Sequence, residues 1–197
     1  MRHQFSLFNS PIDLAHKLWM QLLESGDCAI DATCGNGKDS LALCTIFLEK
    51  KGGFLISLDI QETALSHTHA RIQEHCPQFL PFLSLHQQSH RSFPSIAYEK
   101  KVKLIVYNLG YLPGGDKRIT TLQESTLESL TDALKLISAG GMISLTCYVG
   151  HKEGEQEYLA LKEWFTTLPS DLWSITECSW YNRHKSPILI LLQKNQP

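Results

Sequence analysis

The sequence lacks the features that mark membrane, secreted and metal-clustered proteins. It has no run of about 18 apolar residues, so no transmembrane helix is predicted. Its first residues form no apolar stretch typical of a signal peptide, and we expect a cytoplasmic protein. None of the six cysteines forms a C-x-x-C pair. That spacing argues against a zinc site or a disulfide framework, and it favours reduced cysteines in the core.

A strong excess of charge is also missing. The formal net charge is −2 over 197 residues, which argues against a protein that coats nucleic acid non-specifically. It leaves open a local basic patch that faces one structured RNA. Repeats and low-complexity segments are absent, and the hydrophobic content of 43% is ordinary for a globular domain. We predict one domain over residues 1–197, with residues 1–26 as an N-terminal helical extension packed on it.

What is present is an alternation of helical and strand patterns. Strands separated by helices predict a doubly wound, mostly parallel, seven-stranded α/β sheet. The last two strands have no helix between them and predict a C-terminal antiparallel hairpin. This is the Rossmann-like outline of a class I methyltransferase. Strands are predicted at 28–33, 53–60, 81–86, 102–108, 142–149, 173–180 and 188–193, and helices at 11–26, 38–49, 61–75, 120–138 and 155–168.

A glycine-rich turn, Asp31-Ala-Thr-Cys-Gly-Asn-Gly37, follows the first strand, where α/β sheets bind ligands. The glycines let the backbone approach a ligand, and the next helix offers free N–H groups. Asp39 stands where a P-loop needs Ser or Thr, and Ser40 replaces the third glycine of a dinucleotide fingerprint. Asp31 would also repel a pyrophosphate. It could instead attract the ammonium of S-adenosylmethionine (SAM), directly or through water, so SAM fits best.

Asp59 ends the second strand, where a carboxylate can accept hydrogen bonds from both ribose hydroxyls. NAD enzymes share this feature, so it indicates a nucleoside without choosing which. Turn or strand-end capping is the alternative for Asp31 and Asp59. Further residues at the strand ends complete the predicted cofactor site: Thr33, Gly35, Asn36, Gly37, Asp39, Ile60, Gln61, Gln88, Ser89, His90, Asn108 and Gly110.

The loop after the fourth strand is the predicted catalytic segment. Asn108-Leu-Gly-Tyr111 is similar to the Asn/Asp-Pro-Pro-Tyr/Phe loop of methyltransferases that act on amino nitrogens. Methyl transfer is an in-line displacement, so positioning is the main task. The amide oxygen of Asn108 can accept the amine's N–H bonds, and Tyr111 can stack on a base. Asp116 is either a proton acceptor or substrate anchor, or a surface turn residue. Leu109-Gly110 in place of Pro-Pro disfavours an adenine N6 substrate.

Several predicted strand-end loops carry cations, at His90-Arg91, Lys117-Arg118, His151-Lys152 and 183–185. Convergence of these loops on one rim would suit a phosphate-bearing substrate such as RNA, whereas scattered surface charge is the alternative. The predicted substrate-binding residues are Leu112, Gly114, Lys117, Arg118, His151 and Arg183.

The segments 31–37, 59–61 and 108–117 together resemble the MnmM/YtqB family of methyltransferases, formerly described as rRNA methylases. The resemblance extends from about residue 10 to 194 and includes 119–121 and 148–151. It implies SAM-dependent methylation of the wobble uridine of tRNA, converting 5-aminomethyl-2-thiouridine to its 5-methylaminomethyl form. It also implies a homodimer that contacts the anticodon region, with no DNA, membrane or metal partner. Three readings stay open beside it: an rRNA or small-molecule amine methyltransferase, a non-catalytic RNA-binding module and, more distantly, an NAD oxidoreductase.

Overall fold

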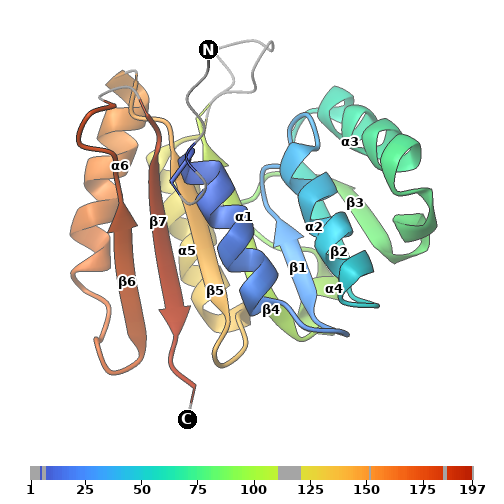
Figure 1. The fold of residues 1–197 in the computed structure, drawn as a ribbon. Coiled ribbons are helices and arrows are strands. Elements are labelled where there is room, and N and C mark those ends of the chain that lie inside the picture. The colour runs from blue at the N-terminus through green and yellow to red at the C-terminus, as the bar shows by residue number, and fades with distance from the viewer. Residues whose placement is uncertain (1–4, 6–7, 111–120, 151, 184–185, 197) are drawn as a thin grey trace.

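A seven-stranded sheet forms the centre of the molecule (Figure 1). The computed structural model describes residues 5, 8–110, 121–150, 152–183 and 186–196. The strand order is β3-β2-β1-β4-β5-β7-β6, with β7 antiparallel to both of its neighbours and the other pairs parallel. This confirms the predicted class I methyltransferase fold and its closing hairpin. The strands are β1 (Cys28–Asp31), β2 (Phe54–Asp59), β3 (Leu83–Gln87), β4 (Val102–Leu109), β5 (Met142–Cys147), β6 (Trp173–Cys178) and β7 (Ile188–Lys194).

Helices cover both faces of the sheet (Figure 1). One face carries α1 (Pro11–Leu22), α2 (Lys38–Glu49) and α3 (Glu62–His75), and the other carries α4 (Ser95–Tyr98), α5 (Gln123–Leu136) and α6 (Lys152–Phe165). Two apolar clusters, one on each face, form the core. Because helices cover both faces, the central strands β1 and β5 are buried along their whole length. Their mostly apolar sequences are the signal of this arrangement.

The boundaries differ from the predicted ones where turn chemistry overrides periodicity. The strand predicted at 81–86 begins at Leu83, because Pro81 lies in a short 3₁₀ helix over Pro77–Phe82. The first helix ends at Leu22 rather than near Gly26. The helix predicted at 155–168 covers Lys152–Phe165.

The N-terminal helix α1 is built into the fold. Ser10 caps it by accepting a hydrogen bond from the backbone N–H of Asp13 at 3.0 Å, and Pro11 takes the first helical position, where no N–H is needed. Ala15 and Trp19 are buried in the cluster that includes α2 and strands β5 and β7. The helix therefore packs on one face of the sheet, in contact with β5, β7 and α2.

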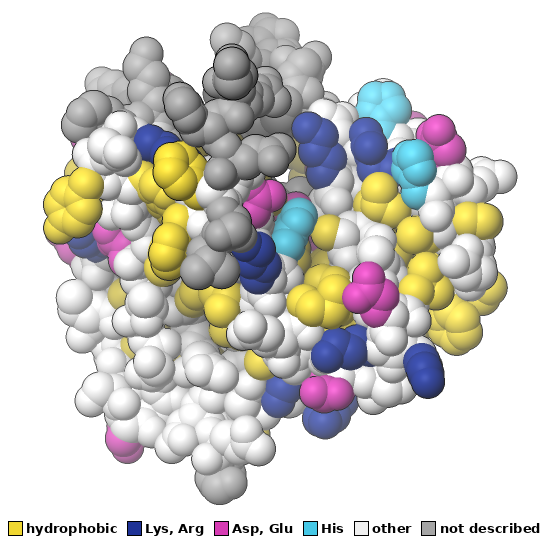
Figure 2. Space-filling model, viewed as in Figure 1, with side chains coloured by type: hydrophobic (Ala, Val, Ile, Leu, Met, Phe, Trp, Pro, Cys, Tyr) yellow, Lys and Arg dark blue, Asp and Glu magenta, His cyan; other side chains and the backbone are white. Residues whose placement is uncertain are grey.

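The surface of this face mixes charges of both signs (Figure 2). No helix in the described part of the chain is long and apolar enough to cross a membrane. The six cysteines are free, and all but Cys178 are buried, as predicted for core thiols. Burial raises the pKa of Cys28 to about 12, so this thiol stays protonated and unreactive.

Candidate functional site

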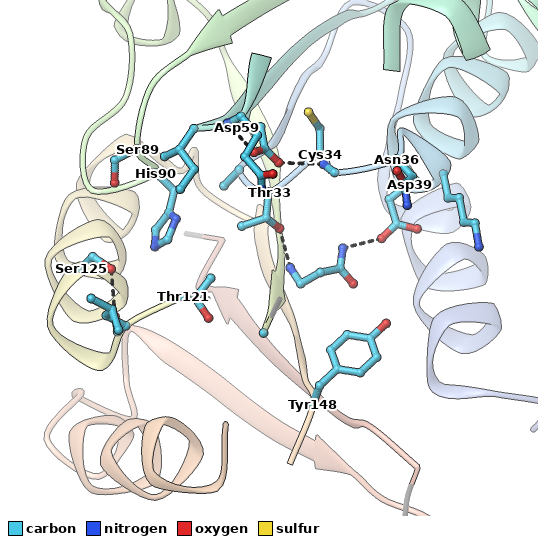
Figure 3. Close-up of a pocket in the computed structure, with 18 of the residues that line it drawn as sticks. Thr33, Cys34, Asn36, Asp39, Asp59, Ser89, His90, Thr121, Ser125 and Tyr148 are labelled. Atoms are coloured by element: carbon cyan, nitrogen blue, oxygen red, sulfur yellow. Dashed lines mark hydrogen bonds between the residues drawn. The ribbon is translucent and has the colours of Figure 1, made fainter. Parts of the chain in front are cut away.

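A cavity of about 760 Å³ opens at the carboxyl ends of the parallel strands. Its walls come from the turns after β1, β2, β3, β4 and β5, together with α1 and the start of α5 (Figure 3). This is the edge at which α/β sheets bind their ligands, and the volume suits a nucleoside-sized cofactor with room beside it.

The turn after β1 is held in shape by its neighbours. Gly35 and Gly37 have φ angles of +49° and +73°, in the left-handed region that favours glycine. Asp59 accepts hydrogen bonds from the backbone N–H of Gly35 at 3.0 Å and of Gln61 at 2.9 Å, so one carboxylate ties the turns after β1 and β2 together. Arg71, on α3, donates to the carbonyl oxygen of Asn36 at 2.8 Å. Asp59 lines the cavity, and each of its oxygens can accept a further bond.

Gly37 serves helix packing rather than the cavity wall. It does not line the cavity, and a Cβ atom on it would lie 2.7 Å from the Cα of Thr68 on α3. The third glycine of a dinucleotide site has this same packing role. The structure therefore supports a packing role for Gly37, and its predicted role in cofactor binding stays a prediction.

Asp31 lies behind the cavity wall. Its side chain is fully buried, accepts a hydrogen bond from the Ser40 hydroxyl at 2.6 Å, and does not line the cavity. Burial, with Asp39 nearby, raises the pKa of Asp31 to about 7. Asp31 is thus placed to brace the turn from behind the cavity wall. Its predicted attraction for an ammonium, directly or through water, stays a prediction. The acid that lines the cavity beside this turn is Asp39.

Asn108 stands at the centre of a hydrogen-bonded group at the end of β4. Its backbone N–H donates to the Thr33 hydroxyl at 2.7 Å, and its Nδ2 donates to Asp39 Oδ2 at 2.8 Å (Figure 3). The other oxygen of Asp39 lies 2.7 Å from His16 Nε2, on α1. Tyr148, which follows β5, also points into this part of the cavity, and burial together with the Asp39 charge raises its pKa. The group joins α1, α2, β1 and β4 at one point.

His90 lines the opposite side of the cavity and is nearly buried. Its ring lies edge-on to Tyr107, with centroids 6.1 Å apart. Burial and the neighbouring Arg91 lower the pKa of His90 to about 4. His90 is therefore neutral near pH 7, which corrects its place among the rim cations. Its neutral ring can meet a base edge without a charge.

Two rim arginines also have partners. Arg91 pairs with Glu128 at 3.1 Å and lies 3.9 Å from Glu124. Arg183 does not line the cavity; its guanidinium donates to the carbonyl oxygens of Phe8 and Asn9 and lies over the Phe5 ring. The substrate-binding role predicted for Arg183 is therefore not supported by its position. It holds the N-terminal segment.

Most of the other predicted cofactor residues do converge. The cavity wall includes Thr33, Gly35, Asn36, Ile60, Gln61, Gln88, Ser89 and Gly110. The prediction missed His16, Thr121, Ser125 and Tyr148, which also line it. Tyr148 could have been found from the rule that strand ends share one edge, whereas nothing in the sequence brings α1 to this place. Seven predicted residues lie outside the described part of the chain: Tyr111, Leu112, Gly114, Asp116, Lys117, Arg118 and His151.

The chemical groups on the cavity wall are suited to binding and orientation. Within the described residues, no group of three His, Cys, Asp or Glu side chains could hold a metal ion. The wall combines a carboxylate at the end of β2, a glycine turn and a side-chain amide at the end of β4. These are groups that grip a nucleoside and hold a polar nucleophile beside it.

Comparisons with known proteins agree with this geometry. A family model described as "Putative rRNA methylase" matches residues 55–194. A chloroplastic tRNA (mnm(5)s(2)U34)-methyltransferase of Arabidopsis thaliana is 33% identical over 189 residues, which cover 93% of this chain and 69% of that protein. A "putative rRNA-methylase" from Clostridium thermocellum has 26% identity and a TM-score of 0.85, covering 94% of this chain and 97% of that one. A "putative methyltransferase" from Streptococcus mutans, solved with SAH, has 23% identity and a TM-score of 0.77, with coverage of 93% and 97%.

Proposed function

The chain belongs to the rRNA methylase family matched above, and from this premise we propose that it is a SAM-dependent N-methyltransferase of tRNA. Its substrate is the primary amine of 5-aminomethyl-(2-thio)uridine at the wobble position, and its product is the 5-methylaminomethyl nucleoside. The Arabidopsis relative, whose name specifies that modified uridine, supports the choice of substrate.

One observation carries the amine assignment: a side-chain amide stands at the end of β4, on the wall of the cavity. Asn108 is held through its backbone N–H and its Nδ2, which leaves its amide oxygen as the acceptor for an incoming amine. A neutral amine bonded there has its lone pair free for an in-line attack. The amine can lose its proton to water before it binds.

The residues around the cavity fit SAM as the cofactor. Asp59 is placed to accept the ribose hydroxyls, and Gln88, Ser89 and His90 lie where the adenine edge would be read. Asp39 and the N-terminus of α2 would face the amino acid end. When bound, SAM supplies an electrophilic methyl group on its sulfonium. The chain's own task is to orient the amine and to exclude water.

A direct test combines the purified protein, SAM and tRNA from cells that lack the modification. Nucleoside mass spectrometry should show that the wobble nucleoside gains one methyl group in place of a hydrogen. SAM binding without any mass gain at that nucleoside would remove the tRNA assignment. We also propose that the protein forms a homodimer that contacts the anticodon region, which light scattering and footprinting test separately.

A small-molecule amine is the second candidate substrate, and the rim favours it. Three of the predicted rim cations have described side chains: Arg91 bonds to Glu128, Arg183 bonds to carbonyl oxygens, and His90 is uncharged. These three side chains therefore offer no unpartnered cation to a phosphate, which suits a substrate without phosphates. Activity on a free amine metabolite, with none on tRNA, would establish this alternative.

A further inference from the structure

A chain of hydrogen bonds runs from α1 to the end of β4. His16 Nε2 lies 2.7 Å from Asp39 Oδ1, and Asp39 Oδ2 accepts from Asn108 Nδ2 at 2.8 Å. All three side chains line the cavity. Asp39 is buried, with 8% of its surface exposed, so water competes little for its oxygens. These hydrogen bonds therefore link α1 to the side-chain amide of Asn108, where we propose that the amine binds.

This chain determines which end of the Asn108 amide faces the substrate. An ionised carboxylate accepts hydrogen bonds and donates none, so the NH₂ group of Asn108 must face Asp39. Its carbonyl oxygen is then turned away from Asp39. A flip of the amide would set two oxygens against each other and would present N–H donors to the amine, which needs an acceptor.

Asp39 can impose that orientation only if it is itself held. Its Oδ1 is fixed by His16, whose ring packs on Trp19 with centroids 4.8 Å apart. Trp19 is buried, with 1% of its surface exposed. The histidine is thus anchored in the core on one side and bonded to the carboxylate on the other. A rotated Asp39 would release the amide.

We propose that His16 is a positioning residue for methyl transfer, which keeps the Asn108 amide oxygen available to the substrate amine by holding Asp39 in place. This inference rests on the proposed function, because it takes the amine as substrate. It also gives a part in the chemistry to α1, a helix that lies outside the residues 55–194 matched by the family model.

Two substitutions separate this role from simple packing. His16→Phe keeps a ring on Trp19 and removes the nitrogen that bonds Asp39. His16→Gln removes the ring and keeps an N–H donor. We expect His16→Phe to lower kcat by about 10- to 100-fold, the scale of a misplaced reacting group, and His16→Gln to recover most of that loss. The kcat is measured at saturating SAM, because Asp39 also faces the proposed amino acid end of the cofactor, and the exposed His69→Phe is the matched control.

The interpretation is overturned if His16→Phe retains the wild-type kcat, or if both variants are equally impaired. His16→Leu replaces the phenylalanine variant if that one fails to fold. Combining His16→Phe with Asp39→Asn should lower kcat little more than Asp39→Asn alone does, because both substitutions break the same series of hydrogen bonds from His16 to Asn108. If the losses of kcat in the two single variants were additive in the double variant, His16 would not act through Asp39.

A second readout does not depend on activity. In ¹⁵N-labelled protein, the Asn108 side-chain amide, assigned by its loss in Asn108→Asp, should lose protection from exchange in His16→Phe and keep it in His16→Gln. An unchanged amide in His16→Phe would refute the proposal. If the wild type bound SAM but did not methylate tRNA, the proposed function would fail, and this measurement would still decide the role of His16.

Discussion

At the scale of single residues, Asp59 has two tasks that one substitution can test together. It braces the glycine turn through the N–H of Gly35 and lines the cavity, where we propose that it accepts the ribose hydroxyls. Asp59→Ala should weaken SAM binding by about 1–3 kcal/mol, as expected for the loss of a charged hydrogen-bond partner. Calorimetry measures this, with the exposed Glu62→Ala as the control. An unchanged affinity would contradict the ribose role.

His90 gives a prediction about pH. Its pKa in the folded protein is about 4, below its ordinary value of 6.5. As pH falls below 6.5, the unfolded chain takes up a proton here that the folded chain refuses, so the free energy of unfolding falls. The loss at this site could approach about 3 kcal/mol by pH 4. His90→Asn should remove this contribution and lose less stability than the wild type between pH 7 and pH 5. Urea unfolding at both pH values measures this loss. If the free energy of unfolding fell equally between pH 7 and pH 5 in the wild type and in His90→Asn, burial of a neutral His90 would be refuted.

The two aspartates near the glycine turn show where residue-level prediction ends. Asp31 and Asp39 both belong to the turn and the helix start, and the sequence does not say which one faces the cavity. The structure assigns the cavity to Asp39, because Ser40 engages the buried Asp31. Which carboxylate faces the cavity depends on side-chain packing that a linear motif does not encode.

At the scale of elements, the close approach of α2 and α3 depends on Gly37. An alanine there would place its Cβ 2.7 Å from the Cα of Thr68 and would keep a left-handed φ. Gly26→Ala meets only the conformational cost, because nothing lies within 4 Å. We expect about 1–2 kcal/mol of destabilisation for Gly26→Ala, and more for Gly37→Ala. Chemical denaturation compares them. If both variants lost the same free energy of unfolding, the close approach of α2 and α3 at Gly37 would not contribute to stability.

Helices and strands were predicted well where the apolar residues recur at a regular spacing. They were predicted less well where their position depends on contacts with residues far away in the sequence. The mostly apolar sequences of β1 and β5 and the helical spacing of α1 indicated their types, and the rule that parallel strand ends share one edge brought the glycine turn, Asp59 and Asn108 together. The docking of α1 beside Asp39 was not predictable, because it depends on Trp19 fitting into a core built from residues far along the chain. His16 enters the site only through that packing.

At the scale of the whole molecule, we propose that one cavity brings a methyl donor and a tRNA amine together. The net charge of −2 and the pairing of Arg91 with Glu128 suit a protein that recognises its substrate through the site rather than through a broad basic surface. An enzyme of this kind should depend on shape and hydrogen bonds as well as on phosphate contacts.

The most direct test follows the methyl group from labelled donor to product. The protein is incubated with SAM carrying a deuterated methyl group and with tRNA containing wobble 5-aminomethyl-2-thiouridine, and the nucleosides are fragmented in a mass spectrometer. The account predicts the label on the side-chain nitrogen with the wild type, and its loss with Asn108→Ala while SAM remains bound. Label on the ribose or the ring, or no transfer by a wild type that binds SAM, would contradict it.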